Sequence, residues 1–173
     1  MHLDNKNENF KWLDSVELEM DQLDEYDNFK DLILKGRFPE GFKKIRVHLV
    51  FDLKHDGRHK PCMVADGHLN DAPLSTVHSG VVSLRCLCII TFLSELNGLE
   101  TWATDIGNAC LEAKTLESAY NIAGSEFGER EGHTLVISKV LYGLCSLGLR
   151  WNERFADCLK DMGLTPCKAD PDL

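Results

Sequence analysis

The sequence predicts an α+β fold, in which an antiparallel sheet is covered by packed helices. Helical periodicity near both ends, two pairs of alternating segments typical of hairpins, and an apolar run between the pairs all favour this class. With 173 residues, 43% of them hydrophobic, the chain can form one domain or a large part of one.

Three helices are expected from the spacing of apolar residues. Residues 12–24 predict an amphipathic helix, because apolar side chains recur at helical spacing and the other face is acidic. Residues 81–96 are apolar and predict a buried helix that ends at Asn97-Gly98. Residues 149–162 predict a last helix with one apolar side, and Gly163 ends it.

The strands are expected in two hairpins. Residues 45–53 alternate between apolar and polar side chains, Asp56-Gly57 predicts a turn, and residues 60–65 predict the returning strand. The segments 118–123 and 134–140 predict the second hairpin.

The segments between these elements give weaker signals. Residues 25–41 are expected to be irregular and 66–76 to form a polar loop, while residues 100–106 predict a short strand that ends on Asp105. A turn is expected over 107–113. We therefore divide the chain into an acidic lead-in, 1–40, and a main region, 41–173, that contains a hairpin at 45–66 and a second part at 80–173.

The distribution of charge is uneven. The net charge is −9, which is unfavourable for a protein that binds nucleic acid. Residues 41–60 reverse this balance, and their basic side chains could contact phosphate: Lys43, Lys44, Arg46, Lys54, Arg58 and Lys60. An ordinary solvated hairpin explains the same charges, and charge alone favours that interpretation.

Cysteine usage and hydropathy indicate an intracellular protein. Seven cysteines without a signal region suit free thiols better than disulfides, and the spacing of Cys86 and Cys88 does not suit zinc. No apolar stretch approaches the roughly 20 residues of a membrane-spanning helix. We expect a location in a cytoplasmic particle or the nucleus, without secretion or membrane association.

Asp105 is the candidate catalytic residue. A carboxylate at the end of an apolar strand, followed by a tight turn, could hold a metal ion in a cleft. Asp105 could equally cap the helical turn that follows it. The segment by itself leaves both interpretations open.

Several segments in order along almost the full chain resemble the reverse transcriptase of copia-type retrotransposons. That family opens with a helix like the one at 12–24, and its fingers hairpin resembles residues 47–67. Asp105-Ile-Gly-Asn-Ala-Cys110-Leu resembles its first catalytic motif, and residues 119–128 resemble its Val-Tyr-Met segment. Leu141-Tyr-Gly-Leu with Arg150-Trp151 resembles a further motif, and Ala169-Asp-Pro-Asp-Leu173 resembles Ser-Asp-Pro-x-Leu.

The resemblance implies the fingers and part of the palm of a polymerase, together with roles for individual residues. Asp105 would bind Mg²⁺ (or Mn²⁺) through its side chain, and Ile106 through its backbone carbonyl. Residues that would contact the incoming nucleotide are Lys60, Cys110, Tyr142 and Gly143. Residues that would contact nucleic acid are Lys43, Lys44, Arg46, Lys54 and Arg58.

Three positions depart from the family pattern. Cys62 and Cys145 stand where basic residues are usual, and Cys110 stands where an aromatic residue is usual. A thiol supplies neither the forked donors of Arg nor a ring beneath the sugar. We interpret these cysteines as small buried residues, and hypothesise that they mark a decaying copy of the element.

The implied activity is RNA-directed DNA polymerisation by two-metal nucleotidyl transfer, on an RNA template, a DNA primer and deoxynucleoside triphosphates. The aromatic-x-Asp-Asp motif that supplies the other carboxylates is absent from these residues. We therefore expect a fragment that is inactive alone, with the rest of a retrotransposon polyprotein as an expected partner. The alternatives are a non-catalytic nucleic-acid-binding remnant and a pseudogene product without a stable fold.

Overall fold

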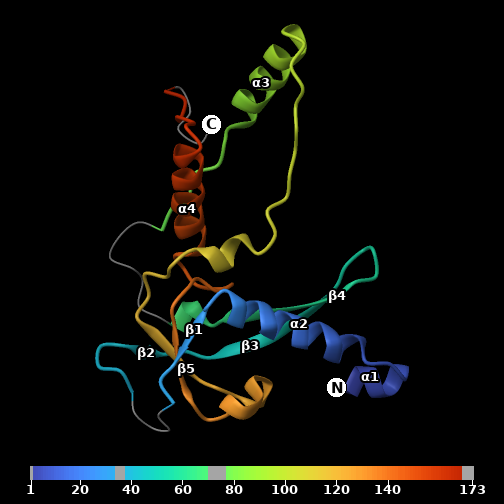
Figure 1. Ribbon diagram of the computed structural model, residues 1–173, viewed down its shortest axis with the longest axis vertical. Helices are drawn as coiled ribbons and strands as arrows, with labels where there is room; N and C mark the ends of the chain where they lie inside the picture. Colours follow the sequence, from blue (N-terminus) through green and yellow to red (C-terminus); the bar gives the residue numbers. More distant parts are fainter. Residues whose placement is uncertain (1, 34–37, 70–76, 169–173) are drawn as a thin grey trace.

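The computed structural model describes residues 2–33, 38–69 and 77–168 (Figure 1). They contain helices and two sheets, which confirms the α+β class. The helices are α1 (His2–Asn7), α2 (Lys11–Glu25), α3 (Leu84–Leu96) and α4 (Leu147–Asp161), with short 3₁₀ segments η1 (Gly67–Leu69), η2 (Ala109–Glu112) and η3 (Ser125–Arg130). The strands are β1 (Phe29–Asp31), β2 (Lys43–Lys44), β3 (Val47–Leu53), β4 (His59–Ala65), β5 (Ala119–Ile122) and β6 (Thr134–Ile137).

The larger sheet has the strand order β1-β6-β5-β2. Its centre is the antiparallel pair β5–β6, which confirms the second predicted hairpin. The prediction missed both edge strands: β1 is antiparallel to β6, and β2 is parallel to β5. Strands of three and two residues are too short to show a period in the sequence, so only their pairing with β6 and β5 defines them.

The other sheet is the hairpin β3–β4, as predicted. Its antiparallel register runs from Val47 opposite Ala65 to Leu53 opposite His59. The turn closes with a 2.8 Å hydrogen bond from the Gly57 amide to the Lys54 carbonyl. Gly57 has φ +83°, a conformation that glycine adopts without steric cost.

Helix α2 packs on the hairpin and confirms the predicted amphipathic helix. Trp12, Val16 and Leu23 are buried. The Asp4 carboxylate accepts the Trp12 and Leu13 amides at 3.0 and 2.9 Å, and so satisfies two donors at the helix start that have no partner within the helix. The Glu19 carboxylate accepts the Met63 amide of β4 at 3.0 Å, which ties the helix to the strand.

The core lies where α2, the hairpin and the larger sheet meet. Its most deeply buried apolar side chains come from all three parts and from the turn after β6: Leu23, Ile45, Met63, Leu135, Ile137, Val140 and Leu141. Trp12 packs in this region, whereas Trp102, in the connection after α3, is 85% exposed.

Helix α3 lies apart from this core (Figure 1). It ends at Asn97-Gly98 as predicted, and the Ser83 hydroxyl accepts the Cys86 amide at its start. The prediction of a buried helix was wrong, because none of its residues is buried. Apolar composition predicted burial, but no element of the described chain covers the helix.

Helix α4 follows the core segment 140–146 and confirms the last predicted helix. It ends before Gly163, whose amide donates to the Lys160 carbonyl at 2.8 Å. Trp151 stacks on Phe155 with ring centroids 5.4 Å apart, yet no residue of α4 is buried. No helix in the described residues combines the length and apolar character needed to cross a membrane.

Candidate functional site

Asp105 lies in a long connection between α3 and η2. The predicted strand over 100–106 is wrong, because this stretch has no strand or helix, and Asp105 and Ile106 are both exposed. The Asp105 carboxylate makes no hydrogen bond or ion pair with any described residue. A strand in that position would need a neighbouring strand to pair with, and the described chain offers none.

The residues of this structure do not fit a two-metal site. Across residues 2–33, 38–69 and 77–168, no three His, Cys, Asp or Glu side chains gather in a metal-binding group. Two metal ions about 3.5–4 Å apart need several oxygen ligands, and Asp105 with the Ile106 carbonyl supplies two. We therefore derive no catalytic step through a metal ion.

In contrast, the residues predicted to contact the incoming nucleotide lie close to one another. Lys60 is exposed on β4, and its charge lowers the pKa of both Cys62 and Cys110. Burial outweighs Lys60 at both thiols, so each has a pKa above the ordinary value of 9.0. Both thiols are therefore neutral at pH 7, and the positive charge of this cluster comes from Lys60.

Tyr142 completes the cluster. Burial, followed by the nearby Cys110 and Cys62 thiols, raises the pKa of Tyr142 to about 12. Tyr142 and Cys110 share a side-chain hydrogen bond. We call Lys60, Cys62, Cys110 and Tyr142 the hairpin cluster, because β4 supplies two of its members and the other two pack beside them.

Gly143 holds Tyr142 against β4 by a close backbone contact. The Ala65 amide donates to the Tyr142 carbonyl at 2.7 Å, and Val64 forms a parallel bridge with Tyr142. Gly143 has φ +88°, and a Cβ there would lie 2.2 Å from the Ala65 carbonyl oxygen. Only glycine fits at this position. Gly143, which the sequence predicts as a nucleotide contact, therefore has a structural role.

The five predicted nucleic-acid contacts do not form one free basic patch. Arg46 pairs with Asp66 at 2.9 Å. Lys54 pairs with Asp52, and Arg58 with Asp56, each at 2.6 Å. Lys43 and Lys44 are exposed on β2, at the edge of the other sheet. Local carboxylates therefore neutralise much of the charge that the sequence places on the hairpin.

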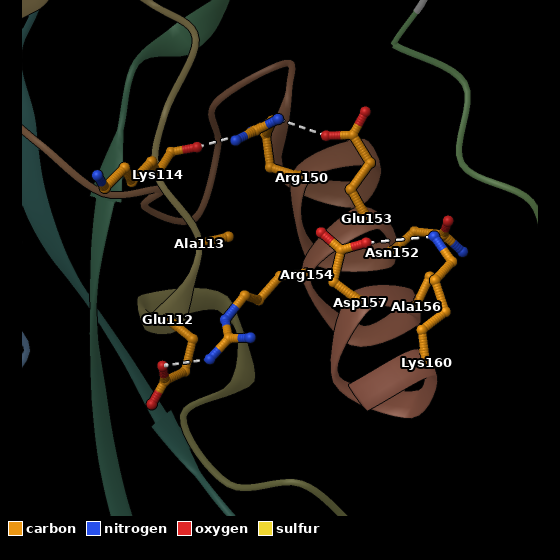
Figure 2. Close-up of a pocket in the computed structure, with 10 residues that line it drawn as sticks. All are labelled: Glu112, Ala113, Lys114, Arg150, Asn152, Glu153, Arg154, Ala156, Asp157 and Lys160. Carbon is orange, nitrogen blue, oxygen red and sulfur yellow. Dashed lines mark hydrogen bonds and ion pairs between the residues drawn. The ribbon is translucent and has the colours of Figure 1, made fainter. Parts of the chain in front are cut away.

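A hollow of about 540 Å³ lies between η2 and α4 (Figure 2). Its charged side chains are largely paired with one another: Arg150 with Glu153, Lys160 with Asp157 at 3.2 Å, and Arg154 with Glu112 at 4.0 Å. Arg150 also donates to the Lys114 carbonyl at 2.8 Å. The contacts of Arg154 with Glu112 and of Arg150 with Lys114 attach α4 to the η2 segment, and together the pairs leave little charge for a ligand.

One family model matches the chain. It is the model for reverse transcriptase (RNA-dependent DNA polymerase), and the match covers residues 33–172, well over half of the chain. The chain belongs to the reverse transcriptase family. No curated protein and no solved structure matches it.

The prediction missed two residues that shape this reverse transcriptase domain. Glu117 is buried, and its carboxylate accepts the Ser146 amide at 2.9 Å, the Ser146 hydroxyl at 2.5 Å and the Thr115 hydroxyl at 2.6 Å. Burial alone would raise its pKa, but these hydrogen bonds outweigh burial and place the pKa below the ordinary value of 4.5. Glu117 thus fixes the end of the segment that carries Tyr142.

The second missed residue is Gly67. A Cβ there would lie 2.2 Å from the Gly143 carbonyl oxygen, so two glycines allow the chain after β4 and the turn before α4 to touch. A glycine in a polar loop is too common to predict such a contact. The signal is visible only when Gly67 and Gly143 are considered as a pair.

The three cysteines that depart from the family pattern differ in exposure. Cys62 and Cys110 are partly buried, in keeping with their interpretation as small packed residues. Cys145 is exposed, so that interpretation was wrong for this residue. All seven cysteines are free thiols, as expected.

Proposed function

We propose that this chain carries the fingers and part of the palm of a copia-type reverse transcriptase. The family's activity is RNA-directed DNA polymerisation, with RNA template, DNA primer, deoxynucleoside triphosphates and Mg²⁺ or Mn²⁺ as its partners. The observation that supports the proposal is the hairpin cluster. In it Cys110 shares a side-chain hydrogen bond with Tyr142 and lies within electrostatic reach of Lys60, although Lys60 and Tyr142 are 82 positions apart in the sequence. We place its action inside the cell, in a retrotransposon particle or the nucleus.

We further propose that these 173 residues do not polymerise DNA by themselves. Two-metal transfer stabilises charge on the attacking and leaving oxygens, and it needs more carboxylates than Asp105 provides. No aromatic-x-Asp-Asp motif occurs among the 173 residues. Asp105 is therefore proposed as one ligand of a site that these residues do not complete.

Primer extension tests this proposal. The chain is incubated with an RNA template, a labelled DNA primer, deoxynucleoside triphosphates and Mg²⁺ or Mn²⁺, and no extension is expected. The matched control is Asp105→Asn. Extension by the unaltered chain that disappears in Asp105→Asn would refute the inactivity.

The second candidate is a module that binds nucleic acid without chemistry. The exposed pair Lys43 and Lys44 on edge strand β2 favours it, together with Lys60 on β4. Replacing these three residues with Gln is expected to weaken binding of a labelled single-stranded oligonucleotide and to flatten its dependence on salt. Undetectable binding at low salt would reject this candidate.

A further inference from the structure

A second basic site lies at the opposite edge of the larger sheet from β2. A hollow of about 350 Å³ is lined there by β1, by the segment after β6 and by the chain after η2. Its lining residues are Asp27, Phe29, Lys30, Lys114, Ser138 and Lys139. Three ammonium groups and one carboxylate give this hollow a net positive charge.

Two of the lysines face each other across a backbone pairing. Lys114 and Lys139 form an isolated antiparallel bridge, and hydrogen bonds on either side fix it: Thr115 amide to Ser138 carbonyl at 3.3 Å, and Val140 amide to Ala113 carbonyl at 2.9 Å. Directly opposed residues in such a pair have Cβ atoms roughly 4.5–5.5 Å apart, and like charges there are destabilising. The backbone therefore places the Cβ atoms of two lysines opposite each other.

No carboxylate of the described chain relieves this repulsion. Lys30, Lys114 and Lys139 take part in no ion pair, although Asp27 lines the same hollow. Lys139 lies over the Tyr26 ring, with its Nζ 5.6 Å from the centroid. Arg130, by contrast, pairs with Asp24 at 2.8 Å. The three lysines thus differ from the paired side chains of the neighbouring hollow.

The side chain of Lys114 points out of that neighbouring hollow. Figure 2 shows its carbonyl directed toward Arg150 and its amino group directed away from α4. Lys114 therefore lines both hollows: its carbonyl accepts a hydrogen bond from Arg150 of α4, and its side chain extends away from α4. The Ser138 hydroxyl in the same lining can donate a further hydrogen bond.

We propose that this hollow binds a phosphate group of a single-stranded nucleic-acid backbone. Lysine ammonium groups bind phosphate as point charges, and a phosphate between Lys114 and Lys139 turns their repulsion into attraction. The choice of nucleic acid as the source of the phosphate rests on membership in the reverse transcriptase family, and it does not require catalytic activity.

The test compares two triple variants of the full chain by fluorescence anisotropy with a labelled 20-nucleotide single-stranded DNA. The test variant is Lys30→Gln, Lys114→Gln and Lys139→Gln. The matched control is Lys6→Gln, Lys11→Gln and Lys168→Gln, which removes the same charge from exposed positions outside the hollow. The test variant should bind at least tenfold more weakly at low salt. Its plot of log K against log salt should be shallower by about 0.7, which is the slope that one phosphate contact on a single strand contributes.

Three outcomes would overturn the proposal: equal loss in both triple variants, no loss in the test variant, or no binding by the unaltered chain. Inorganic phosphate provides a second measurement. It should raise the melting temperature of the unaltered chain more than that of the test variant. Equal increases in melting temperature would contradict phosphate binding in this hollow. The variant of Lys43, Lys44 and Lys60 separates the two proposals, because its loss of binding concerns β2 and β4 and leaves the hollow beside β1 unchanged.

Discussion

The sheet core and helix α3 are both apolar, but only the core is buried. Leu135 in β6 is fully buried, whereas Leu87 in α3 is 50% exposed and Phe92 is 65% exposed. The core side chains come from segments far apart in the sequence that pack on one another, and α3 has no such partner in the described chain (Figure 1). Apolar composition therefore specifies that a segment can be buried, and its neighbours decide whether it is.

The largest loss of stability in the packed region is expected from a substitution at Gly143, where a side chain has no space. In Gly143→Ala the new Cβ would meet the Ala65 carbonyl oxygen and the backbone would be held at positive φ, so we expect the free energy of unfolding to fall by roughly 4 kcal/mol or more. Denaturant titration measures this loss. The matched control is Gly163→Ala, which has φ +84° but open space around it and should lose only about 1–2 kcal/mol. Equal losses would mean that the contact with Ala65 contributes nothing.

The difference between the buried core and the exposed helix α3 is tested by replacing one leucine with alanine in each. Leu135→Ala should lower the free energy of unfolding by about 3 kcal/mol, because it leaves a cavity among buried side chains. Leu87→Ala should change it by less than about 0.5 kcal/mol, because the side chain is half exposed and alanine favours a helix. Urea titrations measure the free energy of unfolding of both variants. A large loss from Leu87→Ala would show that α3 is covered in solution.

Effects below that of Leu135→Ala are expected from two polar contacts at helix starts, one before α4 and one before α3. Glu117→Gln should cost about 2 kcal/mol at pH 7, because the charged acceptor of Ser146 and Thr115 is lost. Ser83→Ala in α3 should cost about 1 kcal/mol of local helix stability, with little change in global unfolding. Hydrogen exchange of α3 amides and thermal unfolding of the core separate the two effects.

Glu117 also predicts a dependence on pH. Its pKa is lowered on folding, so its contribution is complete above the ordinary value of 4.5 and is lost as pH falls through the lower folded-state pKa. Stability measured between about pH 6 and pH 3 should therefore fall less steeply in Glu117→Gln than in the unaltered chain. Identical pH profiles would contradict the lowered pKa.

Much of the fold could be predicted from local patterns in the sequence. The turn at Gly57, the alternation in β3 and β4 and the periodicity of α2 and α4 are properties of neighbouring residues, and each predicted element is present. The strands β1 and β2 are different, because each exists only through its partner in the larger sheet. The predicted strand before Asp105 failed for the same reason, since it found no partner.

The candidate site was predictable in part. The resemblance named Lys60, Cys110, Tyr142 and Gly143, and the structure brings the first three together and gives Gly143 a steric role. Their roles in binding a nucleotide remain predictions. Glu117 and Gly67 could not be found from the sequence, because their function lies in contacts with residues 29 and 76 positions away.

By itself, the sequence determined the family of this chain, its main helices and hairpins, and the presence of a single candidate catalytic aspartate. Those features depend on residue identity and local spacing. Only the tertiary structure decided that α3 is exposed, that Arg46, Lys54 and Arg58 pair with nearby carboxylates, and that Lys114 and Lys139 lie opposite each other in a backbone bridge. Such properties depend on which distant segments meet, because burial and pairing are set by neighbours in space.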